Sequence, residues 1–100
     1  MKLLTKDLEA KIPGPQKSGK DPMVYVKFFQ PFSNWEWYPT EYDKKERMFF
    51  GLVHGFEDEL RLFSLDELEC VREHGIGIER DAFFKPVPLS EVRNSLRACE

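Results

Sequence analysis

The sequence contains little cysteine or histidine. Its two cysteines, Cys70 and Cys99, and its two histidines, His54 and His74, form neither a C-x-x-C nor an H-x-x-x-H pair. A structural zinc site needs about four such ligands at close spacing, so we expect no metal site. In a reducing compartment the cysteines are expected to pack as small apolar side chains and not to form a disulfide.

Signals for export and membrane insertion are also missing. No apolar segment approaches the ~18 residues of a transmembrane helix. The first residues, MKLLTKDLEAKIP, return to charged side chains directly after Leu3 and Leu4, so they lack the apolar region of a signal peptide. We therefore expect a cytoplasmic protein that does not contact a membrane. Its 100 residues are predicted to form one domain, 1–100.

The motifs of common enzymes are absent: the sequence has no Walker loop, no G-x-G-x-x-G and no G-x-S-x-G. Gly75-Ile76-Gly77 follows a predicted helix, whereas a phosphate-binding loop lies between a strand and a helix. The net charge is −3, with acidic and basic residues interspersed. This charge argues against a protein whose main role is to neutralise phosphates. We expect no enzyme activity and no cofactor.

Aromatic residues are abundant instead, with nine Phe, three Tyr and two Trp. They concentrate between Asn34 and Gly55, which we predict to be a β-hairpin with a charged turn at Asp43–Arg47. Strict alternation of side chains predicts the two faces of each strand. On the first strand, Trp35, Trp37, Pro39 and Glu41 share one face, and Glu36, Tyr38, Thr40 and Tyr42 the other. On the second strand, Met48, Phe50, Leu52 and His54 share one face, and Phe49, Gly51, Val53 and Gly55 the other.

Three helices are predicted from their N-terminal capping residues. Thr5 begins the first, which ends before Pro13. Ser64 begins the second in an S-x-x-E capping box, and Gly75 is expected to end it. Ser90 begins the third. Residues 13–22, rich in proline and glycine, are expected to form a flexible loop.

Further strands are predicted on both sides of the hairpin. Met23–Phe29 is β-branched and aromatic, and Glu59–Phe63 alternates so that Leu60 and Leu62 are expected to face the core. A short strand is expected around Ile78, with prolines excluding a regular strand beyond it. Short connections favour antiparallel pairing. We therefore predict an α+β fold, with an antiparallel sheet of four to five strands and about three helices packed mainly on one face.

The aromatic hairpin supplies the candidate interface residues, Trp35, Trp37, Tyr38 and Tyr42. Three interpretations remain open. The rings could fill a thin core, form the contact surface for a protein partner, or stack the bases of a single-stranded nucleic acid. Within the predicted strand Met23–Phe29, Lys27 is the only basic residue that could support the last interpretation.

Two charged groups are further candidates. Glu41 and Asp43 could act as paired acids, although surface ion pairs at a hairpin tip explain them as well. Glu79, Arg80 and Asp81 lie between apolar residues, so this triplet is predicted to form a structural ion pair or a secondary interface. We expect Arg80 to pair with a carboxylate, with Glu41 and Asp43 as candidates, and to tie the late segment to the hairpin.

Five segments in order, VYVKFFQP, NWEWYPTEYD, FFGLVHG, ELRLFSLDELE and IERDAFFKP, resemble the bacterial domain-of-unknown-function family 2958. The resemblance implies a small accessory protein of a plasmid, phage or conjugative element. It also implies a protein partner, with nuclease effectors of host defence as one class and anti-CRISPR or anti-restriction inhibition as the corresponding function. No catalytic residues are implied. We expect a monomer or weak dimer, with single-stranded nucleic-acid binding as the alternative function.

Overall fold

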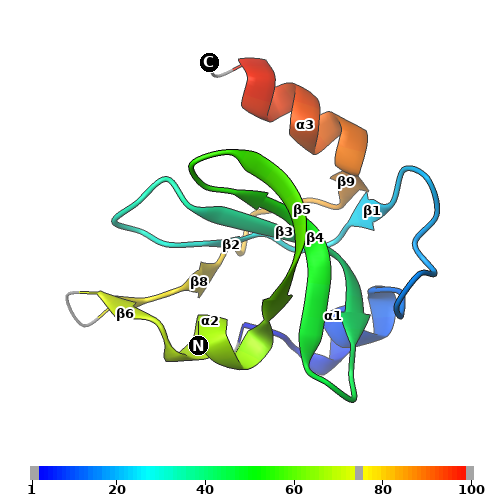
Figure 1. Ribbon diagram of the computed structural model, residues 1–100, viewed down its shortest axis with the longest axis horizontal. Coiled ribbons are helices and arrows are strands. Elements are labelled where there is room, and N and C mark those ends of the chain that lie inside the picture. The colour runs from blue at the N-terminus through cyan, green and yellow to red at the C-terminus, as the bar shows by residue number, and fades with distance from the viewer. Residues whose placement is uncertain (1–2, 74–75, 99–100) are drawn as a thin grey trace.

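The computed structural model describes residues 3–73 and 76–98, and it has the α+β fold that the sequence predicts (Figure 1). The helices are α1 (Lys6–Lys11), α2 (Leu65–Cys70) and α3 (Leu89–Ala98). The long strands are β3 (Glu36–Asp43), β4 (Met48–His54) and β5 (Asp58–Ser64). Two-residue strands complete the fold: β1 (Met23–Val24), β2 (Phe28–Phe29), β6 (Arg72–Glu73), β7 (Ile76–Gly77), β8 (Glu79–Arg80) and β9 (Val87–Pro88).

The predicted hairpin, β3 with β4, lies at the centre of a five-stranded antiparallel sheet of order β5-β4-β3-β2-β8. Two small sheets, β1-β9 and β6-β7, flank it. The predicted strand Met23–Phe29 is divided between two of these sheets, since β1 pairs with β9 and β2 pairs with β3. The expectation that prolines exclude a strand near the C-terminus is wrong, because Val87 and Pro88 pair with β1.

A β-bulge at Thr40 changes which side chains share a face of β3. Pro39 pairs with Gly51 and Glu41 pairs with Phe50, so Thr40 is an extra residue on β3. Strict alternation is therefore wrong beyond Pro39. After the bulge, Tyr42 joins the face that carries Trp37, and Glu41 moves to the face that carries Tyr38.

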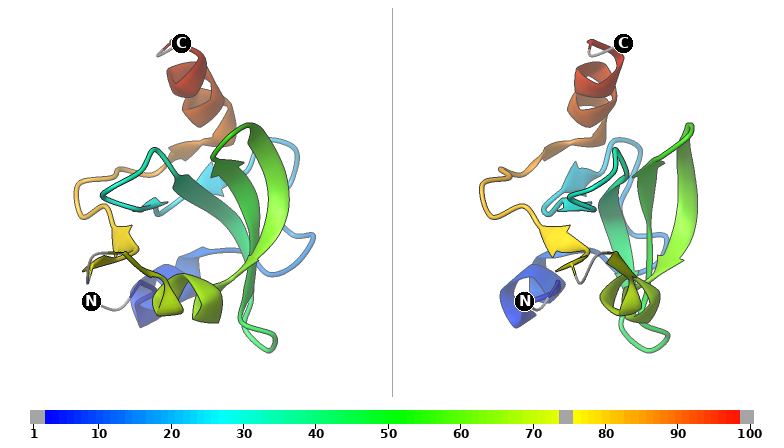
Figure 2. Two further views of the ribbon diagram at one scale, coloured as in Figure 1. Left: turned by 60° about the vertical axis from the view of Figure 1, so that its left-hand side comes forward. Right: turned by 90° about the vertical axis from the view of Figure 1, so that its left-hand side faces the viewer.

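The two faces of the sheet bury two separate clusters. The larger cluster packs with α1 and α2, and its buried members are Leu3, Ile12, Val26, Phe28, Tyr42, Phe49, Val53, Phe63, Leu65, Leu68 and Ile78. The smaller one packs with α3 and contains Val24, Tyr38, Leu52, Leu89 and Val92. The third helix thus lies at the other end of the molecule from α1 and α2 (Figures 1 and 2). On this second face, Leu60 and Leu62 of β5 stay exposed.

The starts of α1 and α2 follow the sequence, but the end of α2 does not. The backbone N–H of Leu8 donates to Thr5 Oγ1 (3.2 Å), and that of Glu67 donates to Ser64 Oγ (3.2 Å). Two of the three predicted N-caps, Thr5 and Ser64, are therefore confirmed. The prediction that α2 continues to Gly75 is wrong, since it ends at Cys70 and the chain turns into β6. Gly75 itself lies outside the described residues.

Hydrogen bonds from other segments fix the loop at residues 13–22 and the start of α3. The Pro13 carbonyl accepts from the N–H of Tyr42 (2.9 Å). Asp21 accepts from both the N–H (2.9 Å) and the hydroxyl (2.7 Å) of Ser90. The prediction that Ser90 is the N-cap of the third helix is wrong, because α3 begins at Leu89 and Ser90 lies within it. The side chain of Asp21, which is far away in the sequence, accepts the hydrogen bonds at the start of this helix.

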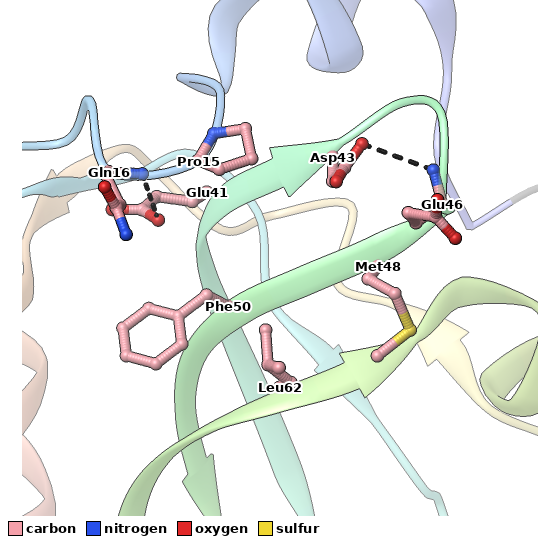
Figure 3. A pocket seen from close by; sticks show the side chains of 8 residues that line it. All are labelled: Pro15, Gln16, Glu41, Asp43, Glu46, Met48, Phe50 and Leu62. Atoms are coloured by element: carbon pink, nitrogen blue, oxygen red, sulfur yellow. Dashed lines mark hydrogen bonds between the residues drawn. The ribbon is translucent and has the colours of Figure 1, made fainter.

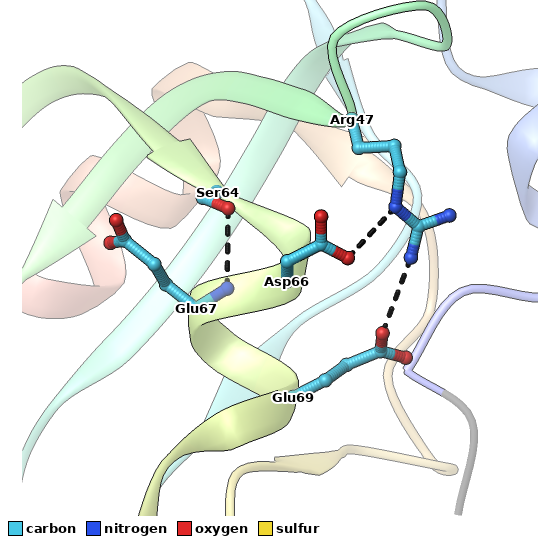
Figure 4. Close-up of polar contacts among 5 residues, drawn as sticks. All are labelled: Arg47, Ser64, Asp66, Glu67 and Glu69. Carbon is cyan, nitrogen blue, oxygen red and sulfur yellow. Dashed lines mark hydrogen bonds and ion pairs between the residues drawn. The ribbon is translucent and has the colours of Figure 1, made fainter.

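The β3–β4 turn is joined to α2 by ion pairs (Figure 4). Arg47 Nε donates to Asp66 (2.8 Å) and its Nη2 to Glu69 (3.4 Å). Arg47 has a φ of 54°, in the left-handed region that closes the turn.

Cys70 is a free, exposed cysteine, so the expectation that it packs as an apolar side chain is wrong. Cys99 lies outside the described residues.

Candidate functional site

The four aromatic residues predicted as an interface differ in exposure. Tyr38 and Tyr42 are 5% and 6% exposed and belong to the two buried clusters, so their rings have little surface to offer a partner. Burial raises the pKa of both phenols, and Glu36, which accepts a hydrogen bond from Tyr38 (2.8 Å), raises that of Tyr38 further. Trp35 and Trp37 are half-buried against the larger cluster.

Phe56 is an exposed aromatic residue that the sequence did not single out. It is 95% exposed, and its ring lies 5.5 Å from that of Trp35 in an edge-to-face arrangement. Gly55 makes room for this arrangement, because a Cβ there would come within 2.6 Å of the Trp35 ring. The only sequence signal for Phe56 was its place directly after a glycine in a turn. Trp35 and Phe56 therefore form a small aromatic surface, and a contact role for Trp35 and Trp37 stays a prediction.

A groove of about 550 Å³ lies on the uncovered face of the sheet (Figure 3). Its apolar floor consists of Met48 and Phe50 on β4 and Leu62 on β5. Its rim carries the carboxylates of Glu41, Asp43 and Glu46, and it continues to Pro15 and Gln16 in the loop before β1. We call this set of residues the acidic groove. No lysine or arginine is among its lining residues.

The bulge in β3 builds this groove. Without the extra residue, Glu41 and Asp43 would lie on the face of Trp37, where α1 and α2 pack. With it, Glu41 pairs with Phe50 and Asp43 with Met48, so that carboxylates and apolar side chains share one face. The hydroxyl of Thr40 holds the bulge by donating to the carbonyl of Phe50 (3.1 Å).

Glu41 and Asp43 are both engaged in hydrogen bonds to nearby segments. Glu41 accepts from the N–H of Gln16 (2.9 Å) and from the hydroxyl of Ser18. Asp43 accepts from the N–H groups of Lys45 (3.0 Å) and Glu46 (3.2 Å) in the turn. All of these donors are neutral groups, and the hydrogen bonds fix the loop and the turn.

Leu62 and its neighbour Leu60 contribute apolar surface where the sequence predicted core. Leu60 is 45% and Leu62 63% exposed, so the expectation that they face the core is wrong. The predicted alternation of side chains along β5 is present. Leu60 and Leu62 lie on the same face of the sheet, because Leu60 pairs with Leu52 and Leu62 pairs with Phe50. However, α3 packs over Leu52 and Tyr38, and the described helices leave the β5 side of this face open.

Comparison with known proteins gives one result. A family model described as "Protein of unknown function (DUF2958)" matches residues 2–98. The chain belongs to this family. No curated protein and no solved structure is significantly similar to it.

In this family member, the charged triplet Glu79, Arg80 and Asp81 lies away from the acidic groove. Glu79 and Arg80 form the edge strand β8, and Arg80 Nη1 donates to the carbonyl of Leu3 (3.3 Å). Asp81 shapes the next turn, where its side chain accepts from the N–H of Phe83 (2.9 Å). All three residues are half-buried, and their role as a secondary interface stays a prediction.

The predicted pair of Arg80 with Glu41 or Asp43 is wrong. Arg80 lies opposite Phe28, which in turn lies opposite Trp37. At ~3.3 Å per residue, Glu41 is about 13 Å further along β3. The guanidinium instead ties β8 to the segment that precedes α1.

Two further observations concern metals and membranes. Among residues 3–73 and 76–98, no three His, Cys, Asp or Glu side chains come together as a metal site. No helix in the described part of the chain is both long enough and apolar enough to cross a membrane.

Proposed function

We propose that this protein is a non-enzymatic binding module and that a partner protein docks in the acidic groove. The observation that carries this proposal is the exposed Leu62, which shares the groove with Phe50, Met48 and three carboxylates. Exposed apolar surface bordered by charged residues is typical of protein-binding sites.

The chemistry of the groove indicates the kind of segment that fits it. Apolar side chains of a partner would cover Phe50 and Leu62, and lysine or arginine side chains would reach Glu41, Asp43 and Glu46. Glu46 is exposed at the mouth of the groove, where it is available to a guanidinium or an ammonium group. A segment that combines basic and apolar residues therefore complements the groove in both charge and polarity.

The hydrogen bonds of the carboxylates support binding over acid–base catalysis. A catalytic acid gives a proton to its substrate and a catalytic base takes one, so either needs its carboxyl oxygen within hydrogen-bond reach of the substrate. Here the side chains of Glu41 and Asp43 accept hydrogen bonds that shape the loop and the turn. Their positions are set by these contacts, which suits them to present a fixed negative surface.

The negative charge of the protein also bears on the class of its partner. Proteins that bind nucleic acids have basic surfaces, and a chain with a net charge of −3 and an acidic groove is complementary to such surfaces. We propose a nuclease effector of host defence as the partner and a mobile genetic element as the origin. In this setting the protein would inhibit the nuclease by occupying a basic site.

Selection of peptides tests the groove directly. Random peptides displayed on phage are selected on the wild-type protein, and the affinities of the enriched peptides are measured by fluorescence anisotropy. We expect them to combine basic and apolar residues. Leu62→Asp and Glu46→Arg should each weaken binding by about tenfold or more, equivalent to ~1.4 kcal/mol. Phe83→Ala is the matched control, because Phe83 is 91% exposed outside the groove.

Two results would contradict the proposal. One is that no peptide is enriched, and the other is that peptides bind both groove variants as well as the wild type. Anisotropy with a single-stranded oligonucleotide at two salt concentrations tests the alternative function. Strong binding that weakens steeply with salt would indicate a nucleic-acid-binding protein instead.

A further inference from the structure

The edge strand β5 is open along one side. It pairs with β4 through seven consecutive residue pairs, from His54 with Asp58 to Met48 with Ser64, without a bulge. In the described part of the chain, no strand pairs with its other side. Because alternate residues of a strand direct their N–H and C=O groups to opposite sides, half of these groups in β5 point away from β4.

The sequence of β5 has only part of the usual protection of an edge strand. Such strands often contain charged residues, proline or a bulge that hinders pairing with another chain. Residues 58–64 include Asp58, Glu59 and Arg61 but no proline, no lysine and no bulge. Residues 58–62 are all exposed, including the apolar Leu60 and Leu62. A regular, exposed strand with apolar residues is suited to pairing with a further strand.

The strand is also complementary to itself. Glu59 and Arg61 alternate with the two leucines, and their side chains are 52% and 55% exposed. In an antiparallel pairing centred on Leu60, each Glu59 faces Arg61 of the second copy. Centring on Glu59 or on Arg61 would place like charges opposite each other, and centring on Leu62 would place Arg61 opposite Phe63. Among residues 58–64, only the first of these registers places opposite charges against each other.

We propose that two copies of this chain dimerise through β5, with a two-fold axis at Leu60. The axis repeats the contact of Glu59 with Arg61, so the dimer gains two cross-strand ion pairs. Within one chain these side chains are only loosely paired, with 3.8 Å between Arg61 Nη1 and Glu59 Oε2. Both copies of Leu60 meet on the face that carries the acidic groove.

The dimer would join two five-stranded sheets into one and place two acidic grooves on the same face. Five residues of each strand, 58–62, form the pairing, which makes a small interface. Interfaces below ~1,200 Å² are typical of weak complexes, so the dimer should form at high protein concentration and dissociate on dilution. This inference does not depend on what the acidic groove binds.

The register can be tested by reversing the charge of Glu59 in one copy and of Arg61 in the other. Sedimentation velocity over a wide concentration range should show the wild type changing from monomer to dimer. Glu59→Arg places two guanidinium groups opposite each other across the axis, and Arg61→Glu places two carboxylates opposite each other. Each variant alone should therefore self-associate at least about tenfold more weakly. An equimolar mixture of the two should form dimers again, because opposite charges then face each other across the axis.

The mixture distinguishes an ion pair between two copies from an ion pair within one chain, because a second molecule cannot restore a pair that forms within one chain. Glu46→Arg is the matched control, because it makes the same charge change outside β5 and should leave dimerisation unchanged. Thermal unfolding of each variant by circular dichroism confirms that it is folded. The proposal is overturned if the wild type stays monomeric throughout, if both single variants dimerise like the wild type, or if the mixture stays monomeric.

Crosslinking gives a second, independent test. With Cys70 and Cys99 replaced by serine, Leu60→Cys should form a disulfide-linked dimer under mild oxidation, since residues opposite each other have Cβ atoms ~4.5–5.5 Å apart. Leu62→Cys, which would face Asp58 of the second copy, should crosslink much more slowly. Equal crosslinking of both variants would contradict the register centred on Leu60.

Discussion

Replacing Gly51 with alanine should separate the two central strands of the sheet. A Cβ at this position would lie 2.7 Å from Pro39 Cα and 3.0 Å from Thr40 N, and closer still to the carbonyl oxygen of Tyr38. These are backbone atoms of β3 at the bulge, so no side-chain rotation can relieve the contact. The strands must move apart or the register must shift.

The expected cost of Gly51→Ala follows from this geometry. Extra methyl groups in well-packed cores cost ~1–3 kcal/mol when side chains can adjust. Here the neighbours are backbone, so we expect a loss of about 3 kcal/mol or more in the free energy of unfolding. The reduced chain entropy of alanine in the unfolded state offsets only ~0.4–1 kcal/mol. For a domain of this size, 3 kcal/mol corresponds to a decrease of about 12 °C or more in the melting temperature.

Urea and thermal unfolding followed by circular dichroism measure this loss. Gly14→Ala is the matched control, because the nearest atom to a Cβ there is Lys17 Cδ, at an ordinary 3.8 Å. The control should unfold like the wild type or at slightly higher temperature. If Gly51→Ala also unfolds like the wild type, then β3 and β4 do not approach as closely as the bulge requires, and our account of the acidic groove fails with it.

Two further predictions concern the aromatic residues. Trp35→Ala should lower the free energy of unfolding by about 2 kcal/mol, less than the ~3–5 kcal/mol of a fully buried tryptophan. Phe56→Ala, at a 95% exposed position, should have little effect in the same urea titration; equal losses would show that Trp35 is not a core residue. Burial raises the pKa of Tyr38 and Tyr42 in the folded state above the unfolded value of ~10. The unfolded state therefore loses these protons at a lower pH than the folded state, so stability should fall as the pH rises above about 10. Tyr38→Phe and Tyr42→Phe should each flatten this fall in urea midpoints measured from pH 8 to 11, and identical slopes in wild type and variants would contradict the assignment.

Local signals in the sequence determined the starts of α1 and α2 and the central hairpin. The side chains of Thr5 and Ser64 cap the helices within a few residues, so no distant contact is needed. The hairpin follows from two aromatic, alternating segments around a charged turn, and the α+β fold follows from the order of the elements. These features depend on neighbours in the chain, which is why the sequence alone predicts them.

Tertiary structure decided which side chains face outward. At the bulge at Thr40, the backbone of β3 packs closely against Gly51. The bulge cannot be recognised in the sequence of β3, and it moves Glu41 to the face of Phe50. The alternation of β5 predicts correctly that Leu62 shares a face with Leu60, but exposure depends on whether a helix covers that face. Since α3 packs at one end of it, the leucines remain accessible, and the acidic groove and the open edge are products of the assembled fold.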